Sequence, residues 1–272
     1  MGLNLQILKK MIELCFLGTG GSVATKERDN TSFLINHNET LLLIDCPGSA
    51  IQKIKKLNLS PLKIKTILVT HIHPDHVYGL PSFVHSLMLD EGLISLYGSA
   101  ESVDFCRNLL DLFHLRDEKI KTRVDFIPLG PGQDFQLTES IRCTSLKIPH
   151  SSSSLAYHFR FEGEKKELIY SGDTPPDTLL FRDAEEKDYL VHDCSAPSRF
   201  FKMYPSLHEM HTHSLELGSH SQRSGVKCLI PCHFFGELEF SLSEIENEIR
   251  KNYKGKMIIP KDYEKIILLS QK

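Results

Sequence analysis

The chain has 272 residues, 40% of them hydrophobic and 25% charged, which is enough apolar material for a sizeable buried core. Its net charge of −3 excludes histone-like binding of nucleic acid through an overall positive field. No apolar run reaches the roughly 18 residues of a membrane span, and the stretch 3–8 ends at Lys9 and Lys10. Seven cysteines without a CxxC pair predict free thiols. We therefore expect a cytoplasmic protein with no membrane partner.

Strands and helices alternate along the chain. In the first half, strands are predicted at 12–17, 32–35, 41–45 and 64–70, and helices at 49–57 and 77–89. In the second half, strands are predicted at 141–147, 155–161, 167–170, 189–191, 226–230, 257–259 and 265–269, and helices at 214–224 and 241–252. No linker, repeat or low-complexity stretch interrupts this order. The pattern is typical of an α/β protein, and we expect residues 1–272 to form a single domain.

Four potential metal ligands lie within six residues after the predicted strand 64–70, namely His71, His73, Asp75 and His76. In an extended segment, residues two apart point the same way, so His71 and His73 can converge on one ion. Asp75 and His76 begin the next turn and point elsewhere, which indicates two neighbouring metal positions. Surface histidines are the alternative, but imidazoles and a carboxylate packed this closely are best explained by a cation.

Two metal ions need more ligands than one loop provides. Three isolated residues of suitable chemistry follow other predicted strands, namely His150, Asp173 and His233. Each of them taken singly is more often a cap or a solvated turn residue. Because all three recur at the same topological position, the sequence predicts that they share one site with the histidine cluster.

At this point the sequence resembles the metallo-β-lactamase superfamily and, within it, the ribonuclease Z-like phosphodiesterase branch. The motifs that carry the resemblance are the glycine loop at 17–22 running into 30–32, the HxHxDH cluster at 71–76, the SGDT segment with Asp173, and His233. The match extends from residue 16 to residue 233. It implies an αββα sandwich, in which two mixed sheets pack face to face with helices outside and the metals lie at one edge.

The same resemblance implies the ligand set. One zinc ion would be held by His71, His73 and His150, the second by Asp75, His76 and His233, and Asp173 would bridge them. Imidazole and carboxylate ligands suit zinc, although ligand type alone does not exclude manganese or iron. Two cations about 3.5 to 4 Å apart lower the pKa of a shared water and clamp a phosphoryl group, so hydrolysis is the natural reaction. We expect Asp75 also to orient the attacking hydroxide.

A further histidine fits the branch. His213 resembles the non-ligand histidine that protonates the leaving oxygen or stabilises charge in the transition state. His208, His211 and His220 are neighbours in the sequence and remain open for this role, and surface histidines on a loop are the plain alternative. Asp193 falls where the branch often has a carboxylate that orients such a histidine.

Several other segments allow two interpretations. The glycine loop 18–22 is either a backbone surface near the substrate phosphate or a tight turn that needs positive φ. The segment 199–204 either stacks a base and holds a phosphate or covers the core. The basic stretches 53–65 and 116–123 are most simply solvated faces, with nucleic-acid binding as the alternative.

The interval between His150 and Asp173 is short and lacks a Gly/Pro-rich insertion, whereas ribonuclease Z carries a protruding transfer-RNA-binding arm there. The expected function is therefore a dinuclear phosphodiesterase acting on a small or cyclic phosphodiester or on an RNA 3′ end. Hydrolysis of another ester (sulfate ester, lactone or thioester) is the second possibility. An iron-dependent oxidoreductase or a non-catalytic metal-binding protein is the third, although no flavin or nicotinamide fingerprint is present. A homodimer is possible.

Overall fold

A computed structural model describes residues 11–38 and 40–268 of the protein. The apolar stretch 3–8 and the last residue of the predicted strand 265–269 lie outside the described residues. Within the described part of the chain, no helix is both long enough and apolar enough to cross a membrane.

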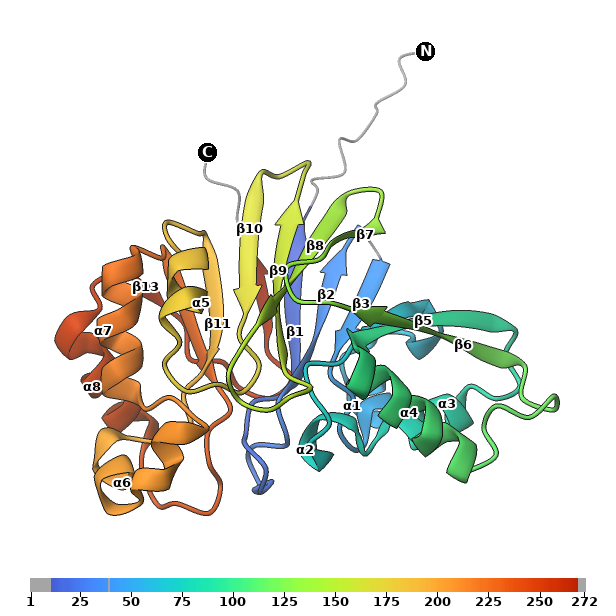
Figure 1. Cartoon of the computed structure of the whole chain (residues 1–272), viewed down its shortest axis with the longest axis horizontal. Coiled ribbons are helices and arrows are strands. Elements are labelled where there is room, and N and C mark those ends of the chain that lie inside the picture. The colour runs from blue at the N-terminus through green and yellow to red at the C-terminus, as the bar shows by residue number, and fades with distance from the viewer. Residues whose placement is uncertain (1–10, 39, 269–272) are drawn as a thin grey trace, which may run out of the picture.

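The strands form two seven-stranded sheets that pack face to face, and β7, β8 and β9 of one sheet overlap the first strands of the other in the view of Figure 1. The first sheet has the order β14-β1-β2-β3-β4-β5-β6, with β14 Lys265–Leu268, β1 Ile12–Gly18, β2 Ser32–His37, β3 Thr40–Ile44, β4 Ile64–Leu68, β5 Gly92–Ser99 and β6 Thr122–Leu129. The second has the order β13-β12-β11-β10-β9-β8-β7, with β13 Lys256–Met257, β12 Cys228–Cys232, β11 Tyr189–Asp193, β10 Lys166–Tyr170, β9 Leu155–Phe161, β8 Ile141–Lys147 and β7 Asp134–Thr138. Both sheets mix parallel and antiparallel pairs.

Helices cover the outer face of each sheet. The helical segments are α1 Ala50–Lys56, η1 Pro61–Lys63, α2 Pro74–Val77, α3 Leu80–Ser86, α4 Ala100–Leu112, α5 Thr178–Asp183, α6 Ser198–Met203, η2 Pro205–Glu209, α7 Ser214–Ser224 and α8 Leu242–Asn252. One buried cluster joins α1, α3 and α4 to the first sheet, and another joins α5, α7 and α8 to the second (Figure 1). The predicted αββα sandwich is therefore confirmed.

The central core lies between the two sheets. Phe16 and Phe33 from the first sheet meet Tyr157 and Tyr170 from the second, all of them buried. The rings of Phe33 and Tyr170 are 5.0 Å apart and nearly perpendicular at 82°, a favoured arrangement of aromatic pairs. Because these strands are covered on both faces, they read in the sequence as continuous apolar runs. This packing holds the ends of the two sheets together at the edge where the predicted ligands lie.

The predicted helix 77–89 is confirmed only over α3, residues 80–86, because residues 78 and 79 form a turn between the end of α2 and α3. The interruption is at Gly79, where a Cβ atom would lie 2.0 Å from the carbonyl oxygen of Pro47. The Gly79 N–H donates to the Cys46 carbonyl, so the chain is pressed against the segment that follows β3. This close approach requires glycine, and it is a tertiary contact that a helical pattern does not reveal.

The strands β5, β6 and β7 and the helix α4 were not predicted. In β6 only the first and last residues are buried, and the residues between them are intermediate or exposed.

The basic stretch 53–65 was predicted to be a solvated face, and this prediction is corrected at one residue. Lys55, Lys56, Lys63 and Lys65 are exposed, but Lys53 is only 2% exposed and forms an ion pair of 2.8 Å with Asp29. A lysine this buried requires such a partner.

Candidate metal centre

The seven predicted ligands all follow strands that end at one edge of the sandwich. After β4, His71 and His73 lie in the loop and Asp75 and His76 lie in α2, whereas His150, Asp173 and His233 follow β8, β10 and β12. The structure brings the seven side chains together in two overlapping groups, His71, His73, His150 and Asp173, and Asp75, His76, Asp173 and His233. Within each group the possible ligand atoms lie within 4.8 Å of one another. Asp173 is the only residue that the two groups share, as a bridging ligand would be.

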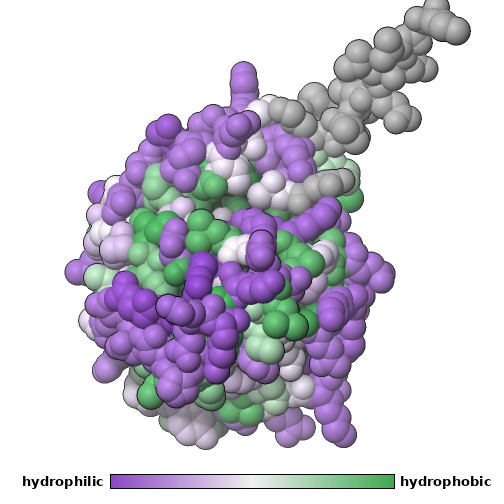
Figure 2. Space-filling view, turned by 90° about the vertical axis from the view of Figure 1, so that its right-hand side faces the viewer, coloured by the Kyte–Doolittle hydropathy of each residue, from purple (hydrophilic) through white to green (hydrophobic). Residues whose placement is uncertain are grey.

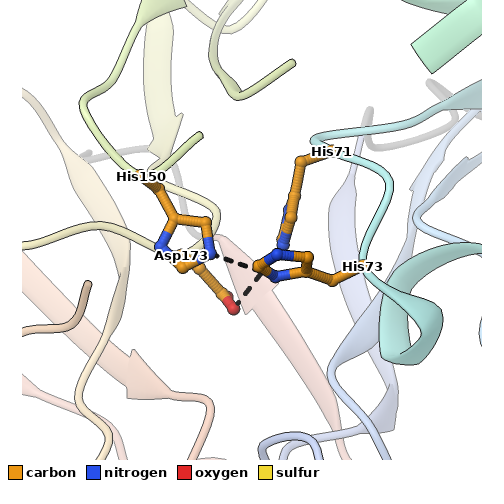
Figure 3. Close-up of side chains that lie close together, drawn as sticks. All are labelled: His71, His73, His150 and Asp173. Atoms are coloured by element: carbon orange, nitrogen blue, oxygen red, sulfur yellow. Dashed lines mark hydrogen bonds and ion pairs between the residues drawn. The ribbon is translucent and has the colours of Figure 1, made fainter. Parts of the chain in front are cut away.

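The first group is drawn in Figure 3, where its four side chains point toward a common centre. His150 Nε2 lies 3.2 Å from His73 Nδ1, and His71 Nε2 lies 3.8 Å from Asp173 Oδ2. In the second group, Asp173 Oδ2 lies 3.0 Å from His233 Nε2 and 3.4 Å from His76 Nε2. Imidazole nitrogens and carboxylate oxygens this close together form the donor set of a divalent cation.

Hydrogen bonds from surrounding residues orient these imidazoles. His76 Nδ1 lies 2.8 Å from Asp45 Oδ2, and His150 Nδ1 lies 2.8 Å from the Met210 carbonyl. The Thr70 hydroxyl donates to Asp45, so the contact of 3.0 Å between His71 Nδ1 and Thr70 Oγ1 has the imidazole as donor. A donating Nδ1 leaves the Nε2 lone pair free for a metal.

The inward-facing atoms lack partners. His71 Nε2, His76 Nε2 and Asp173 Oδ1 are buried and have no hydrogen-bond partner among the described residues. Buried polar atoms of native proteins are almost always satisfied. The residues therefore fit the divalent metal that their chemistry suggests, because cations held by the two groups would satisfy all three atoms.

Charges within the cluster shift the pKa values of its members. Burial disfavours a charge on His76, but the carboxylates of Asp173 and Asp45 raise its pKa well above the usual range. Burial works against the Asp173 carboxylate, yet the imidazoles of His233 and His76 bring its pKa well below the ordinary value. His71 has its pKa lowered, mainly by burial. A cation that binds here competes with protons for these imidazoles.

One residue of the cluster and one residue that contacts it have left-handed backbone conformations that non-glycine residues rarely adopt. Asp45 has φ 55° and His233 has φ 64°. The backbone of the glycine loop supports the second, because the Gly21 N–H donates to the Phe234 carbonyl and the Phe234 N–H donates to the Thr19 carbonyl. Such conformations persist only where the surrounding structure holds them, and they cluster at functional sites.

The glycine loop is not a positive-φ turn, because Gly18, Gly20 and Gly21 have no positive φ. Its glycines are required for close approach instead. A Cβ atom on Gly18 would lie 2.0 Å from the Asn30 carbonyl oxygen, and one on Gly21 would lie 2.8 Å from the Phe235 ring and 3.4 Å from the His233 ring. The loop therefore packs directly against a predicted metal ligand.

The four histidines between residues 208 and 220 lie in different parts of the structure. His211 is buried, stacks on His233 at 5.3 Å, and its Nδ1 lies 2.9 Å from Asp193 Oδ2. Asp193 is itself held by the Ser195 hydroxyl at 2.6 Å. Asp193 thus lies where the resemblance implied, but its partner is His211. His220 lies on α7, away from the metal ligands, and its ring stacks on that of Phe181 in α5.

His213 lies outside the metal cluster. It is the N-cap of α7, where its Nδ1 accepts the Glu216 N–H at 3.2 Å and its Nε2 faces the Glu216 carboxylate at 3.1 Å. Burial lowers the pKa of His213 to about 4. His208 and His213 pack around Phe201. The geometry therefore assigns His213 to the start of a helix and leaves His211 as the histidine against the centre.

Asp45 and Thr70 were not singled out as site residues, and His211 was named only as an alternative to His213. Asp45 ends a predicted strand, and an acidic residue at a strand end was the signal that identified Asp173. The same signal could have found Asp45. The sequence does not show which histidine between 208 and 213 faces the metal ligands, because this depends on how η2 joins α7.

Comparison with known proteins adds independent observations. The family described as Anti-Pycsar protein Apyc1 matches residues 12–222, most of the chain. The chain belongs to this family. The Apyc1 family match includes the loop 71–76, His150, Asp173 and His211, and ends before His233.

This Apyc1 family member also resembles individual proteins. It is 23% identical to the ribonuclease Z of Methanosarcina mazei over 91% of this chain and 95% of that protein. The metallo-β-lactamase fold protein YhfI from Bacillus subtilis superposes with a TM-score of 0.78 at 18% identity, covering 95% of this chain and all of the other. The short form of human tRNase Z gives 0.73 at 18% identity, over 93% and 98%. The predicted superfamily, its ribonuclease Z-like branch and a metal-dependent hydrolase of the phosphodiesterase kind are confirmed.

Proposed function

We propose that this protein hydrolyses a small or cyclic phosphodiester with two zinc ions held by the two ligand groups that share Asp173. That shared carboxylate is the observation that carries the proposal, because it sets two cation positions side by side. Two such cations supply an activated water and positive charge for the phosphoryl oxygens. Zinc is favoured by the imidazole-rich donor set, and manganese or iron would fit the same ligand types.

The side chains divide the remaining work. Asp75 Oδ2 lies 3.4 Å from His233 Nε2 and is positioned to accept a hydrogen bond from the attacking water and to orient it. His211, held at Nδ1 by Asp193, keeps Nε2 for proton transfer to the leaving oxygen. We assign the general acid to His211 rather than to His213, because both ring nitrogens of His213 face Glu216 at the start of α7.

The substrate surface supports a small substrate. The interval from His150 to Asp173 is filled by the antiparallel hairpin of β9 and β10, with no protruding arm in this fully described interval. An RNA 3′ end remains the second candidate, since the similar protein of Methanosarcina mazei is named ribonuclease Z. Without the arm, a large RNA would lack the remote contacts that support turnover.

The segment 199–204 contributes little to such a surface. Phe200 and Phe201 are buried, and Arg199 packs over Phe200 at 3.9 Å while it pairs with Glu244. This supports the interpretation that the segment covers the core. The seven cysteines are buried and free, as is typical of a reducing compartment, and a cytoplasmic location is part of the proposal.

The proposal is tested by a substrate screen on protein loaded with zinc or manganese. Cyclic nucleotides, a linear phosphodiester, a phosphomonoester, a sulfate ester and precursor transfer RNA would be compared at equal concentration. We expect turnover of cyclic or small linear phosphodiesters and poor processing of the RNA. Preferential hydrolysis of the sulfate ester, or efficient cleavage of the transfer RNA at low concentration, would contradict it.

We further propose that the protein is a homodimer through the face of α3 and α4. Figure 2 shows hydrophobic residues within the hydrophilic surface on this side of the molecule. Leu112, Phe113 and Tyr78 are 77%, 61% and 52% exposed, and a cavity of about 720 Å³ lies beside them. A cluster of large apolar side chains that are exposed to solvent typically marks a site of interaction with another protein. Sedimentation analysis should show a dimer that Phe113→Glu dissociates and that the control Leu179→Glu leaves intact.

A further inference from the structure

His233 differs from three other imidazoles of the metal cluster in how its ring is held. His71, His76 and His150 each have a hydrogen-bond partner at Nδ1. Nδ1 of His233 is buried and has no hydrogen-bond partner among the described residues, and Asp193 Oδ1 lies 3.8 Å from it. A ligand ring that no hydrogen bond orients depends on its own backbone for its direction.

The backbone of His233 is held in an uncommon conformation by the glycine loop. Its φ is 64°, and the residue that follows it, Phe234, is bonded to the loop at both of its peptide groups. The Gly21 N–H donates to the Phe234 carbonyl at 2.7 Å, and the Phe234 N–H donates to the Thr19 carbonyl at 3.1 Å. A left-handed conformation of this kind persists only where the surrounding structure holds it. The direction of the His233 ring therefore depends on where Thr19 and Gly21 lie.

Two side chains from other segments fix Thr19. Thr19 is fully buried, and its hydroxyl accepts a hydrogen bond from Arg28 Nη1 and donates one to Asp262 Oδ1 at 2.7 Å. Asp262 Oδ2 accepts the Asp29 N–H at 2.7 Å, and the Arg28 guanidinium lies 4.8 Å above the Phe234 ring. We call Thr19, Arg28 and Asp262 the Thr19 clamp. It ties the glycine loop to the segment between β13 and β14, on the side of the loop that bonds Phe234.

We propose that the three residues of the Thr19 clamp are positioning residues for the metal ligand His233. Their side chains act through the backbone of the glycine loop, so loss of the Thr19 hydroxyl lets the loop, and with it the His233 ring, change position. The cation held by the ligand group that contains His233 should then bind more weakly. The cation held by the group that contains His71 should be affected less. This inference rests on the proposed function, because it concerns the same two-metal centre.

The first test measures zinc affinity by competition with a chromophoric chelator. Thr19→Val replaces the hydroxyl by a methyl group, and Thr19→Ser keeps it. Thr19→Val should bind one ion as the wild type does and the other about tenfold more weakly, since loss of a supporting hydrogen bond typically weakens metal binding at least this much. Thr19→Ser should bind both ions as the wild type does. Wild-type affinity for both ions in Thr19→Val, or equal weakening by Thr19→Ser, would overturn the inference.

Thr144→Val is the matched control. The Thr144 hydroxyl likewise donates to a carboxylate, that of Asp134 at 2.8 Å, which also pairs with Arg142. This variant should bind both ions with wild-type affinity, and the same weakening as in Thr19→Val would overturn the inference.

A double-mutant cycle shows whether the hydroxyl acts through His233. His233→Ala removes the ring that the clamp positions, so adding Thr19→Val to it should cause no further loss of zinc affinity. A further tenfold loss in the double variant would overturn the inference, because the hydroxyl would then act on the centre by another route.

NMR spectra of the imidazoles in metal-free protein separate this inference from the proposed function. The His233 ring signals should shift or broaden in Thr19→Val and not in Thr144→Val. This result would support the clamp even if the wild type hydrolysed no phosphodiester or bound fewer than two ions. Unchanged signals would overturn the clamp and leave the proposed function standing. Should Thr19→Val fail to fold, Asp262→Ala must change the same signals, with Asp134→Ala as its control, and an unchanged spectrum would again overturn the inference.

Discussion

The chain has two short histidine-rich segments that look alike in sequence and behave differently in the fold. All four ligand-type residues of the segment 71–76 point into the metal cluster. Of the histidines in 208–213, only His211 reaches the cluster, whereas His208 and His213 face Glu216 on the other side. In the first segment, His71 and His73 lie in the loop directly after β4, and Asp75 and His76 lie in α2, so the four side chains meet at one edge of the sheet. The second joins a 3₁₀ turn to α7, which rotates successive side chains apart.

The largest effect is expected for a substitution in the metal cluster that the segment 71–76 helps to form. Asp173→Ala removes the one carboxylate that both ligand groups share, so metal content should fall from close to two ions per chain and phosphodiesterase activity should be lost. Metal analysis of the dialysed protein together with turnover would measure this. A variant that keeps two tightly bound ions and near-normal activity would contradict the dinuclear arrangement.

The second prediction distinguishes the role of His211 from that of His213. His211→Ala should lower kcat about 10² to 10⁴-fold and leave metal content unchanged, because general-acid assistance is typically worth this much. His213→Ala should keep kcat within a few-fold of wild type. The loss in His211→Ala should be far greater for an alkyl phosphodiester than for a nitrophenyl ester, whose leaving oxygen needs no proton. The opposite ranking of the two variants would restore His213 as the acid.

A smaller effect tests the role of His213 at the start of α7. His213→Ala removes the side chain that accepts the Glu216 N–H, and loss of an N-cap typically costs about 1 kcal/mol in the free energy of unfolding. Denaturant unfolding would measure it, and His213→Asn should recover most of the loss because asparagine is a good N-cap. Equal destabilisation by both variants would show that packing, not capping, is responsible.

The smallest effect is a pH dependence. The pKa of His213 is lowered to about 4 in the folded protein, mainly by burial, so between this value and about 6.5 only the unfolded chain binds the proton. Its contribution therefore destabilises the fold as pH falls through this window. The melting temperature of the wild type should drop more steeply than that of His213→Asn. Parallel curves would contradict the lowered pKa, because the metal cluster titrates alike in both proteins.

Much of the candidate centre could be predicted because its signals are local. A ligand-type residue after a strand, as at Asp173 and His233, lies at the edge where strand ends converge, whatever the details of packing. The division of the predicted helix 77–89 at Gly79 and the burial of Lys53 could not be predicted. Both depend on contacts with segments distant in the sequence, namely Pro47 and Asp29.

The amino-acid sequence by itself determined the α/β alternation and the ligand types, because periodicity and residue chemistry are properties of neighbours along the chain. Only the tertiary structure decided which histidine meets Asp193, since that depends on the angle at which η2 joins α7. It also decided that the glycine loop packs against His233 and Phe235. These arrangements arise where segments from opposite ends of the chain come into van der Waals contact, and a linear pattern does not encode that geometry.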